Sequence, residues 1–143
     1  MTDRKATTVW TGDIARGKGQ VTLDTSGAAE FTVSFPSRAQ EANGQTSPEE
    51  LIAAAHSACY SMQLSGLLGK NGTPPESIET NAVVTFGPQG EGFAILGIAL
   101  TTRATVPGLD ADTFTTLATT AKQICPVSAA LTGTTITLDA ALN

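Results

Sequence analysis

The sequence has few of the residues on which disulfide frameworks and metal sites depend. It contains two cysteines, Cys59 and Cys125, and a single histidine, His56, among 143 residues. Two distant cysteines in a reducing compartment are not expected to form a structural disulfide. They are also too few for a zinc site unless His56 and a carboxylate complete it. Buried thiols, a redox pair and a nucleophile remain open interpretations of the two cysteines.

Long apolar runs, basic charge and aromatic residues are also scarce. No run of 18 apolar residues occurs, and Met1–Lys5 is not followed by the apolar core of a signal peptide. The net charge of -5 argues against a nucleic-acid surface. A cytoplasmic protein with no membrane or nucleic-acid partner is therefore expected. Aromatics make up only 5% of the chain, so the core must be largely aliphatic, and a second copy is one way to complete it.

The length and the patterning predict one α+β domain over residues 1–143. Strands are predicted where β-branched residues alternate with polar ones, at 7–11, 20–24, 31–35, 78–86, 93–105 and 135–139. A turn at 87–90 should join the two longest strands, and 36–46 should form a loop. Helices are predicted at 47–69, from Asp110 or Asp112 to Ile124, and after Cys125. The expected architecture is an antiparallel sheet packed on a long central helix and a second helix.

The central helix has a clear start signal in the sequence. Ser47 suits the N-cap, Pro48 the first helical position and Glu50 the third, which predicts a capping box between Ser47 and Glu50. Glu49 is not needed for the cap, so its carboxylate is available for another role. The small residues of 53–55 leave a thin helix surface that another backbone can approach closely.

Cys59 lies in the middle of this helix, where the helix N-terminus cannot activate it. A thiol with an ordinary pKa is only about 3% thiolate at pH 7. To act as a nucleophile it needs a nearby cation, and the candidates are Arg38, Arg16 and protonated His56. Cys125 precedes Pro126 at the expected start of the last short helix, where partial positive charge favours a thiolate.

Two other classes of function fit the same residues. His56 precedes Cys59 by three positions on one helix face, which fits a Cys–His hydrolase as well as a merely hydrogen-bonded histidine. Alternatively, the cysteines are packing residues of a non-catalytic binding protein involved in stress. The glycines of 12–19 lack the order of a phosphate-binding loop.

Four segments together resemble the OsmC/Ohr family, the osmotically inducible and organic hydroperoxide resistance proteins. They are Gly12-Asp-Ile-Ala-Arg-Gly-Lys-Gly19, the helix from Ser47 to Met62, Val106-Pro-Gly-Leu-Asp110, and Ala121-Lys-Gln-Ile-Cys125-Pro-Val-Ser128. The similarity spans nearly the whole chain. His56 and the Gly-Lys-Gly segment point to the OsmC branch.

The resemblance implies an antioxidant thiol peroxidase that reduces organic hydroperoxides, and hydrogen peroxide less well, without a cofactor. It assigns Cys59 as the peroxidatic cysteine, Cys125 as the resolving cysteine, and Glu49 as the carboxylate that orients an activating arginine. That arginine is Arg38 by the pattern of the OsmC branch and Arg16 by that of the hydroperoxide resistance branch. The expected reductant is a dithiol such as a lipoylated protein.

Helix geometry adds a homodimer to this interpretation. Glu49 and Cys59 are ten residues apart, about 15 Å along one helix, which is too far for both to serve one reaction centre within a subunit. Two such helices crossing antiparallel near Ala54 would place Glu49 of one chain beside Cys59 of the other. An intertwined homodimer with shared active sites is therefore expected, in line with the dimers of the family.

Overall fold

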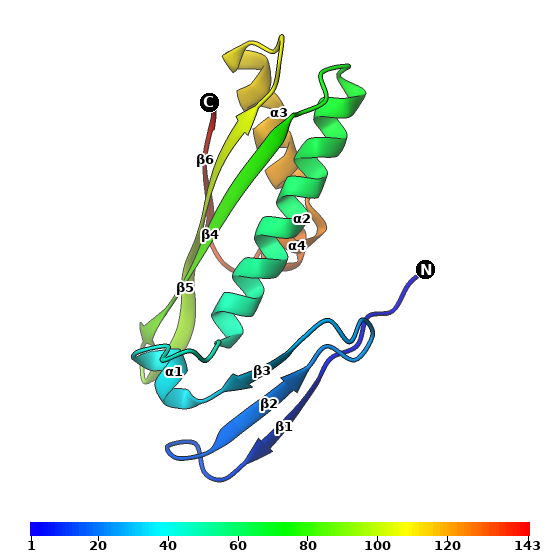
Figure 1. The fold of residues 1–143 in the computed structure, drawn as a ribbon. Helices are drawn as coiled ribbons and strands as arrows, with labels where there is room; N and C mark the ends of the chain where they lie inside the picture. Colours follow the sequence, from blue (N-terminus) through cyan, green and yellow to red (C-terminus); the bar gives the residue numbers. More distant parts are fainter. The chain divides into compact units, whose positions relative to one another are not determined.

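A computed structural model describes all 143 residues, and the chain divides into two compact units, 1–51 and 52–143 (Figure 1). Each unit has a three-stranded sheet, so the predicted α+β class is confirmed. The interpretation of 1–143 as a single domain stays a prediction. No helix is long and apolar enough to cross a membrane.

The first unit is built on an antiparallel sheet in the order β1-β2-β3. Its strands are β1 (Thr7–Thr11), β2 (Lys18–Thr22) and β3 (Glu30–Val33). Val21 of β2 and Val33 of β3 are its only buried hydrophobic side chains, whereas every residue of β1 is exposed. This unit therefore has a very small core of its own.

A short helix, α1 (Phe35–Ala39), replaces the predicted end of the third strand and start of the loop. Ser34 caps it by accepting a hydrogen bond from the Ser37 amide at 3.1 Å. The Ser37 hydroxyl in turn accepts one from the Ser34 amide at 3.0 Å, and Pro36 suits the first turn. The predicted loop at 36–46 was wrong only for 36–39, because a serine takes the place that Glu usually has in a capping box; 40–46 are irregular, as predicted. The helix places Arg38 in its last turn.

The predicted central helix is confirmed as α2 (Pro48–Lys70), although its cap differs from the expected one. The Ser47 hydroxyl accepts a hydrogen bond from the Glu50 amide at 3.1 Å, as predicted. The Glu50 carboxylate, however, accepts one from the Thr46 hydroxyl instead of reaching back to the Ser47 amide. Only half of the predicted capping box is formed.

This difference predicts unequal contributions of Ser47 and Glu50 to stability. We expect Ser47→Ala to lower the free energy of unfolding by about 1 kcal/mol, because an amide at the helix start loses its acceptor. Glu50→Gln should cost only about 0.3 kcal/mol, since it changes mainly the interaction with the helix dipole. Urea unfolding of both variants measures these values, and an equal loss in both would contradict the half-formed cap.

The second unit contains a mixed sheet in the order β4-β5-β6. A long hairpin pairs β4 (Ser77–Gln89) with β5 (Gly92–Thr105), and the turn is at 90–91 rather than at 87–90 as predicted. Gly90 has a φ of 60°, which glycine adopts without strain. The last strand, β6 (Ile136–Leu142), pairs with β5 in parallel. The sheet is therefore not wholly antiparallel, contrary to the prediction.

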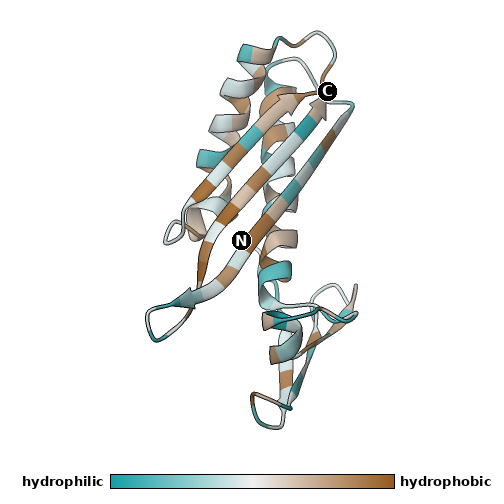
Figure 2. Cartoon of the chain, turned by 90° about the vertical axis from the view of Figure 1, so that its left-hand side faces the viewer, coloured by the Kyte–Doolittle hydropathy of each residue, from teal (hydrophilic) through white to brown (hydrophobic).

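Helices α2 and α3 (Ala111–Ile124) cover one face of this sheet, and hydrophobic residues alternate with polar ones along the strands (Figures 1 and 2). The buried core consists of side chains from α2, β5 and α3, together with one residue that follows β5 and one that follows α3. These core residues are Tyr60, Leu64, Leu68, Leu100, Ala104, Val106, Phe114, Ala118, Ala121 and Cys125. Helix α4 (Pro126–Ala130) follows directly. The core thus fixes both Cys125 and the middle of α2.

Candidate functional site: a thiol pair and an arginine–glutamate pair

The two cysteines lie in contact in the second unit. Cys59 projects from α2, Cys125 lies between α3 and α4, and their Sγ atoms are 3.1 Å apart as free thiols. Cys125 is fully buried, whereas Cys59 is partly exposed. A disulfide requires a separation of about 2.05 Å, so a small movement would join the two sulfurs. The predicted redox pair is thus brought together.

The surroundings of the two thiols affect their pKa values in opposite directions. Burial and the hydrogen bond with Cys125 raise the pKa of Cys59. Burial alone would raise the pKa of Cys125, but the Ser128 amide, Cys59, the Ser128 hydroxyl and the Val127 amide together lower it. These amides face the sulfur without making a strict capping hydrogen bond. Within the second unit, the Val127 amide favours the Cys59 thiolate, but burial and Cys125 outweigh this effect and keep the pKa of Cys59 raised.

Arg38 and Glu49 form an ion pair in the first unit. The Arg38 Nη2 atom lies 2.7 Å from Oε1 of Glu49, and its Nε lies 3.1 and 3.2 Å from the two carboxylate oxygens. The Glu49 side chain is only 8% exposed, against 35% for Arg38. This forked contact holds the guanidinium plane in a fixed orientation. Helices α1 and α2 supply one partner each.

Arg16, the other predicted arginine, has a different partner. Its guanidinium lies 3.3 Å from the Asp13 carboxylate, three residues earlier in the loop between β1 and β2. The Arg16 side chain is 89% exposed, so solvent screens this pair. The structure thus pairs Glu49 with Arg38 and not with Arg16.

His56 is fully buried and does not contact Cys59 through a hydrogen bond. Its Nε2 atom lies 2.7 Å from the Ser128 hydroxyl, and its Nδ1 atom has no hydrogen-bond partner. The Cys–His pair that a hydrolase would need is not formed. Ser128 was not among the predicted site residues, although its position three residues after Cys125, one helical turn away, is the signal that could have indicated it.

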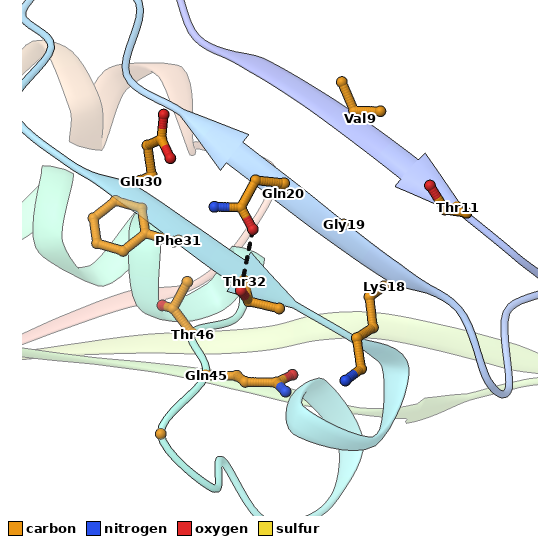
Figure 3. A pocket seen from close by; sticks show the side chains of 11 residues that line it. Val9, Thr11, Lys18, Gly19, Gln20, Glu30, Phe31, Thr32, Gln45 and Thr46 are labelled. Carbon is orange, nitrogen blue, oxygen red and sulfur yellow. Dashed lines mark hydrogen bonds between the residues drawn. The ribbon is translucent and has the colours of Figure 1, made fainter.

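A cavity of about 670 Å³ lies over the sheet of the first unit and carries none of this chemistry (Figure 3). Its walls are the polar side of β1–β3 and the segment 44–46, with a hydrogen bond of 3.1 Å from Thr32 to Gln20. Lys18 and Glu30 are its only charged residues. It contains no thiol and none of the predicted site residues, so we do not assign the reaction to it.

Within this α+β fold, two free thiols lie 3.1 Å apart, with Cys125 in the buried core and Cys59 packed against it, which suits a reversible disulfide. The OsmC-like protein family matches residues 41–139, which include both cysteines. The chain belongs to this family.

Individual relatives agree with this assignment. The chain is 46% identical over 136 residues to the Peroxiredoxin OsmC of Escherichia coli (strain K12), covering 95% of this chain and 94% of the relative. It is 32% identical over 108 residues to the Organic hydroperoxide resistance protein of Xanthomonas axonopodis pv. citri, covering 74% of each. The crystal structure of an organic hydroperoxide resistance protein from Elizabethkingia anophelis superposes with a TM-score of 0.79 at 26% identity, covering 100% of this chain and 98% of that one. The greater identity to OsmC confirms the predicted branch.

Proposed function

We propose that the protein is a cysteine-based peroxidase that reduces organic hydroperoxides and forms a disulfide between Cys59 and Cys125. The observation that carries the proposal is the 3.1 Å separation of the two sulfurs. Membership of a family that includes a Peroxiredoxin OsmC and an Organic hydroperoxide resistance protein supports the same activity and an antioxidant role in stress. Hydrogen peroxide should be a poorer substrate.

The reaction proceeds in two steps, and the two sulfurs are the protein atoms that form and break bonds. The Cys59 thiolate attacks the terminal peroxide oxygen, and the O–O bond breaks. The terminal O–H group stays on sulfur, and the departing alkoxide takes up a proton from water and leaves as an alcohol. Cys59 is then a sulfenic acid. The Cys125 thiolate attacks the Cys59 sulfur, the S–S bond forms, and the hydroxide that leaves is protonated to water. An external dithiol, such as that of a lipoylated protein, returns both thiols by exchange.

Arg38 has the role of activating Cys59, and Glu49 orients its guanidinium. The need for a cation follows from the raised pKa of Cys59, which keeps the nucleophile protonated within its own unit. The forked contact with Glu49 supports Arg38 for this role, whereas Arg16 is exposed and paired with Asp13. A guanidinium is always charged and has enough donors for both Glu49 and a thiolate.

The active site is composite and belongs to a homodimer. Glu49 and Cys59 are about 15 Å apart along α2, so the arginine–glutamate pair of one subunit serves the thiols of the other. Small exposed residues on α2, Ala54, Ala55 and Ala58, support a close crossing of two such helices. Exposed apolar side chains elsewhere also support burial against a second copy: Val9, Trp10, Ile14, Met62, Val83, Phe93, Leu96 and Ile124. We place the dimer in the cytoplasm, where dithiol reductants are available.

A thiol titration tests the proposed function. One equivalent of tert-butyl hydroperoxide should consume two thiols per chain and produce an intramolecular disulfide, which mass spectrometry of the unreduced protein locates between Cys59 and Cys125. A hydrolase would instead turn over esters and leave peroxide untouched. If Cys59 reacts with the hydroperoxide no faster than free cysteine does, the proposed function is wrong. Repeating the titration with a fatty-acid hydroperoxide identifies the preferred substrate.

A further inference from the structure

His56 and Ser128 form a buried pair that the peroxidase mechanism does not yet use. His56 has no exposed surface, and Ser128 is 4% exposed. The distance from Nε2 of His56 to the Ser128 hydroxyl is 2.7 Å, which is short for a hydrogen bond involving nitrogen. Burial lowers the pKa of His56, so the ring is neutral at pH 7. A neutral imidazole has one N–H and one bare nitrogen, and the position of the hydrogen decides what the pair does.

Ser128 connects this histidine to the resolving cysteine. It is the third residue of α4, one helical turn after Cys125, and the first helical position is Pro126. The Ser128 amide and hydroxyl both favour the thiolate of Cys125, against the effect of burial. The hydroxyl thus lies 2.7 Å from the ring nitrogen of His56, and it belongs to the third residue of the helix whose N-cap is Cys125.

The Ser128 hydroxyl has one hydrogen and can donate only one hydrogen bond, so its choice of acceptor decides whether His56 or Ser128 is the donor between them. If Ser128 donates to the Cys125 sulfur, its oxygen can accept from His56, so the ring must carry its hydrogen on Nε2. Nδ1 is then a bare acceptor, which agrees with its lack of a partner. The reverse order would turn the hydroxyl hydrogen toward His56 and bury an unpaired Nδ1–H group, which is costly.

We propose that His56 is a positioning residue that donates from Nε2 to Ser128, so that the Ser128 hydroxyl donates to the Cys125 thiolate as it attacks the oxidised Cys59. The role in resolution rests on the proposed function, whereas the hydrogen-bond order does not. Among the other titratable groups nearby, Tyr60 feels the charge of Cys125, which adds to burial in raising the pKa of Tyr60. The hydrogen bonds of Tyr60 and Lys122, however, go to backbone carbonyls. Tyr60 on α2 donates to the Ala118 carbonyl at 3.2 Å, and Lys122 on α3 donates to the Ile136 carbonyl at 2.7 Å.

The order of donors can be measured without peroxide. His56 is the only histidine of the chain, so the ¹⁵N spectrum of histidine-labelled reduced protein contains one pair of ring signals. At pH 7 we expect a protonated Nε2 and a bare Nδ1. A proton on Nδ1 instead would overturn the proposal.

A second experiment measures the effect of Ser128 on the Cys125 thiol. In the Cys59→Ser protein Cys125 is the only thiol, so ultraviolet absorbance follows its titration. The pKa of Cys125 should be higher after Ser128→Ala and unchanged after Ser128→Thr, which keeps the hydroxyl. An equal pKa in all three proteins would also overturn the proposal.

Kinetics separate this role from a purely structural one. Loss of one hydrogen bond to the anion lowers the thiolate fraction at pH 7 about tenfold, but a more basic thiolate attacks faster. Formation of the disulfide in Ser128→Ala should thus be about threefold slower at pH 7 and about threefold faster once Cys125 is fully ionised in both proteins. Oxidation of Cys59 by peroxide should be unchanged. His56→Gln, which keeps a buried amide donor, should lie between the wild type and Ser128→Ala. Parallel rate profiles that never cross would contradict the proposal.

Discussion

Cys59→Ser should lower the peroxidase activity by at least about 10³-fold, whereas Cys125→Ser should react with its first equivalent of hydroperoxide at close to the wild-type rate. The difference follows from the proposed order of the two steps. Cys59 supplies the sulfur that accepts oxygen, and no hydroxyl replaces it as a nucleophile at neutral pH. Cys125 acts only after the alcohol has left, so its loss stops the reaction at the sulfenic acid.

Stopped-flow mixing with a single equivalent of tert-butyl hydroperoxide measures this difference. In Cys125→Ser, excess peroxide should then convert Cys59 to the sulfinic acid, because no second thiol traps the sulfenic acid. The result is informative because, within the second unit, the environment favours the thiolate on Cys125 and not on Cys59. If Cys125→Ser loses its first turnover and Cys59→Ser keeps it, the roles of the two cysteines are reversed.

Arg38→Ala should lower the second-order rate constant for oxidation of Cys59 about a hundredfold. An opposite charge near a thiol lowers its pKa by about two pH units, and that effect is lost with the guanidinium. Arg38→Lys keeps the charge but cannot make the forked contact with Glu49, so we expect about a tenfold loss. The measurement is the pH dependence of the oxidation rate, whose midpoint should move to higher pH in both variants.

The matched control is Arg16→Ala. Arg16 is an exposed arginine that pairs with Asp13, and its removal should change the rate less than twofold. Because Arg38→Ala leaves the Glu49 carboxylate buried without its ion pair, urea unfolding must show that this variant is folded. Equal losses in Arg16→Ala and Arg38→Ala would contradict the choice of Arg38.

Much of the fold could be predicted from the sequence because its local signals agree with the tertiary structure. Ser47-Pro48 starts α2, and β-branched residues mark the long hairpin. The errors fall where local signals compete. Gly87-Pro88 has the composition of a turn, yet Pro88 pairs with Phe93 and the chain turns at Gly90. The parallel pairing of β6 with β5 depends on partner choice across the sheet, which periodicity does not encode.

The sequence predicted some residues of the candidate site through the family resemblance and missed others. The pairing of Cys59 with Cys125, and of Arg38 with Glu49, could be anticipated only through the family resemblance, because residues this far apart in the sequence meet through tertiary packing. Ser128 was missed because a serine after a proline looks like an ordinary residue of a helix start. Its function as a partner of His56 appears only when α2 and α4 pack together.

The central claim is that the arginine of one subunit activates the cysteine of the other, and a mixed dimer tests it most directly. Cys59→Ser and Arg38→Ala chains, co-expressed with different tags and purified as the heterodimer, should recover about half the activity of the wild-type dimer. One of the two sites then combines an intact Arg38 from the Cys59→Ser chain with an intact Cys59 from the other. A heterodimer no more active than Arg38→Ala alone would place each site within a single subunit and contradict the account.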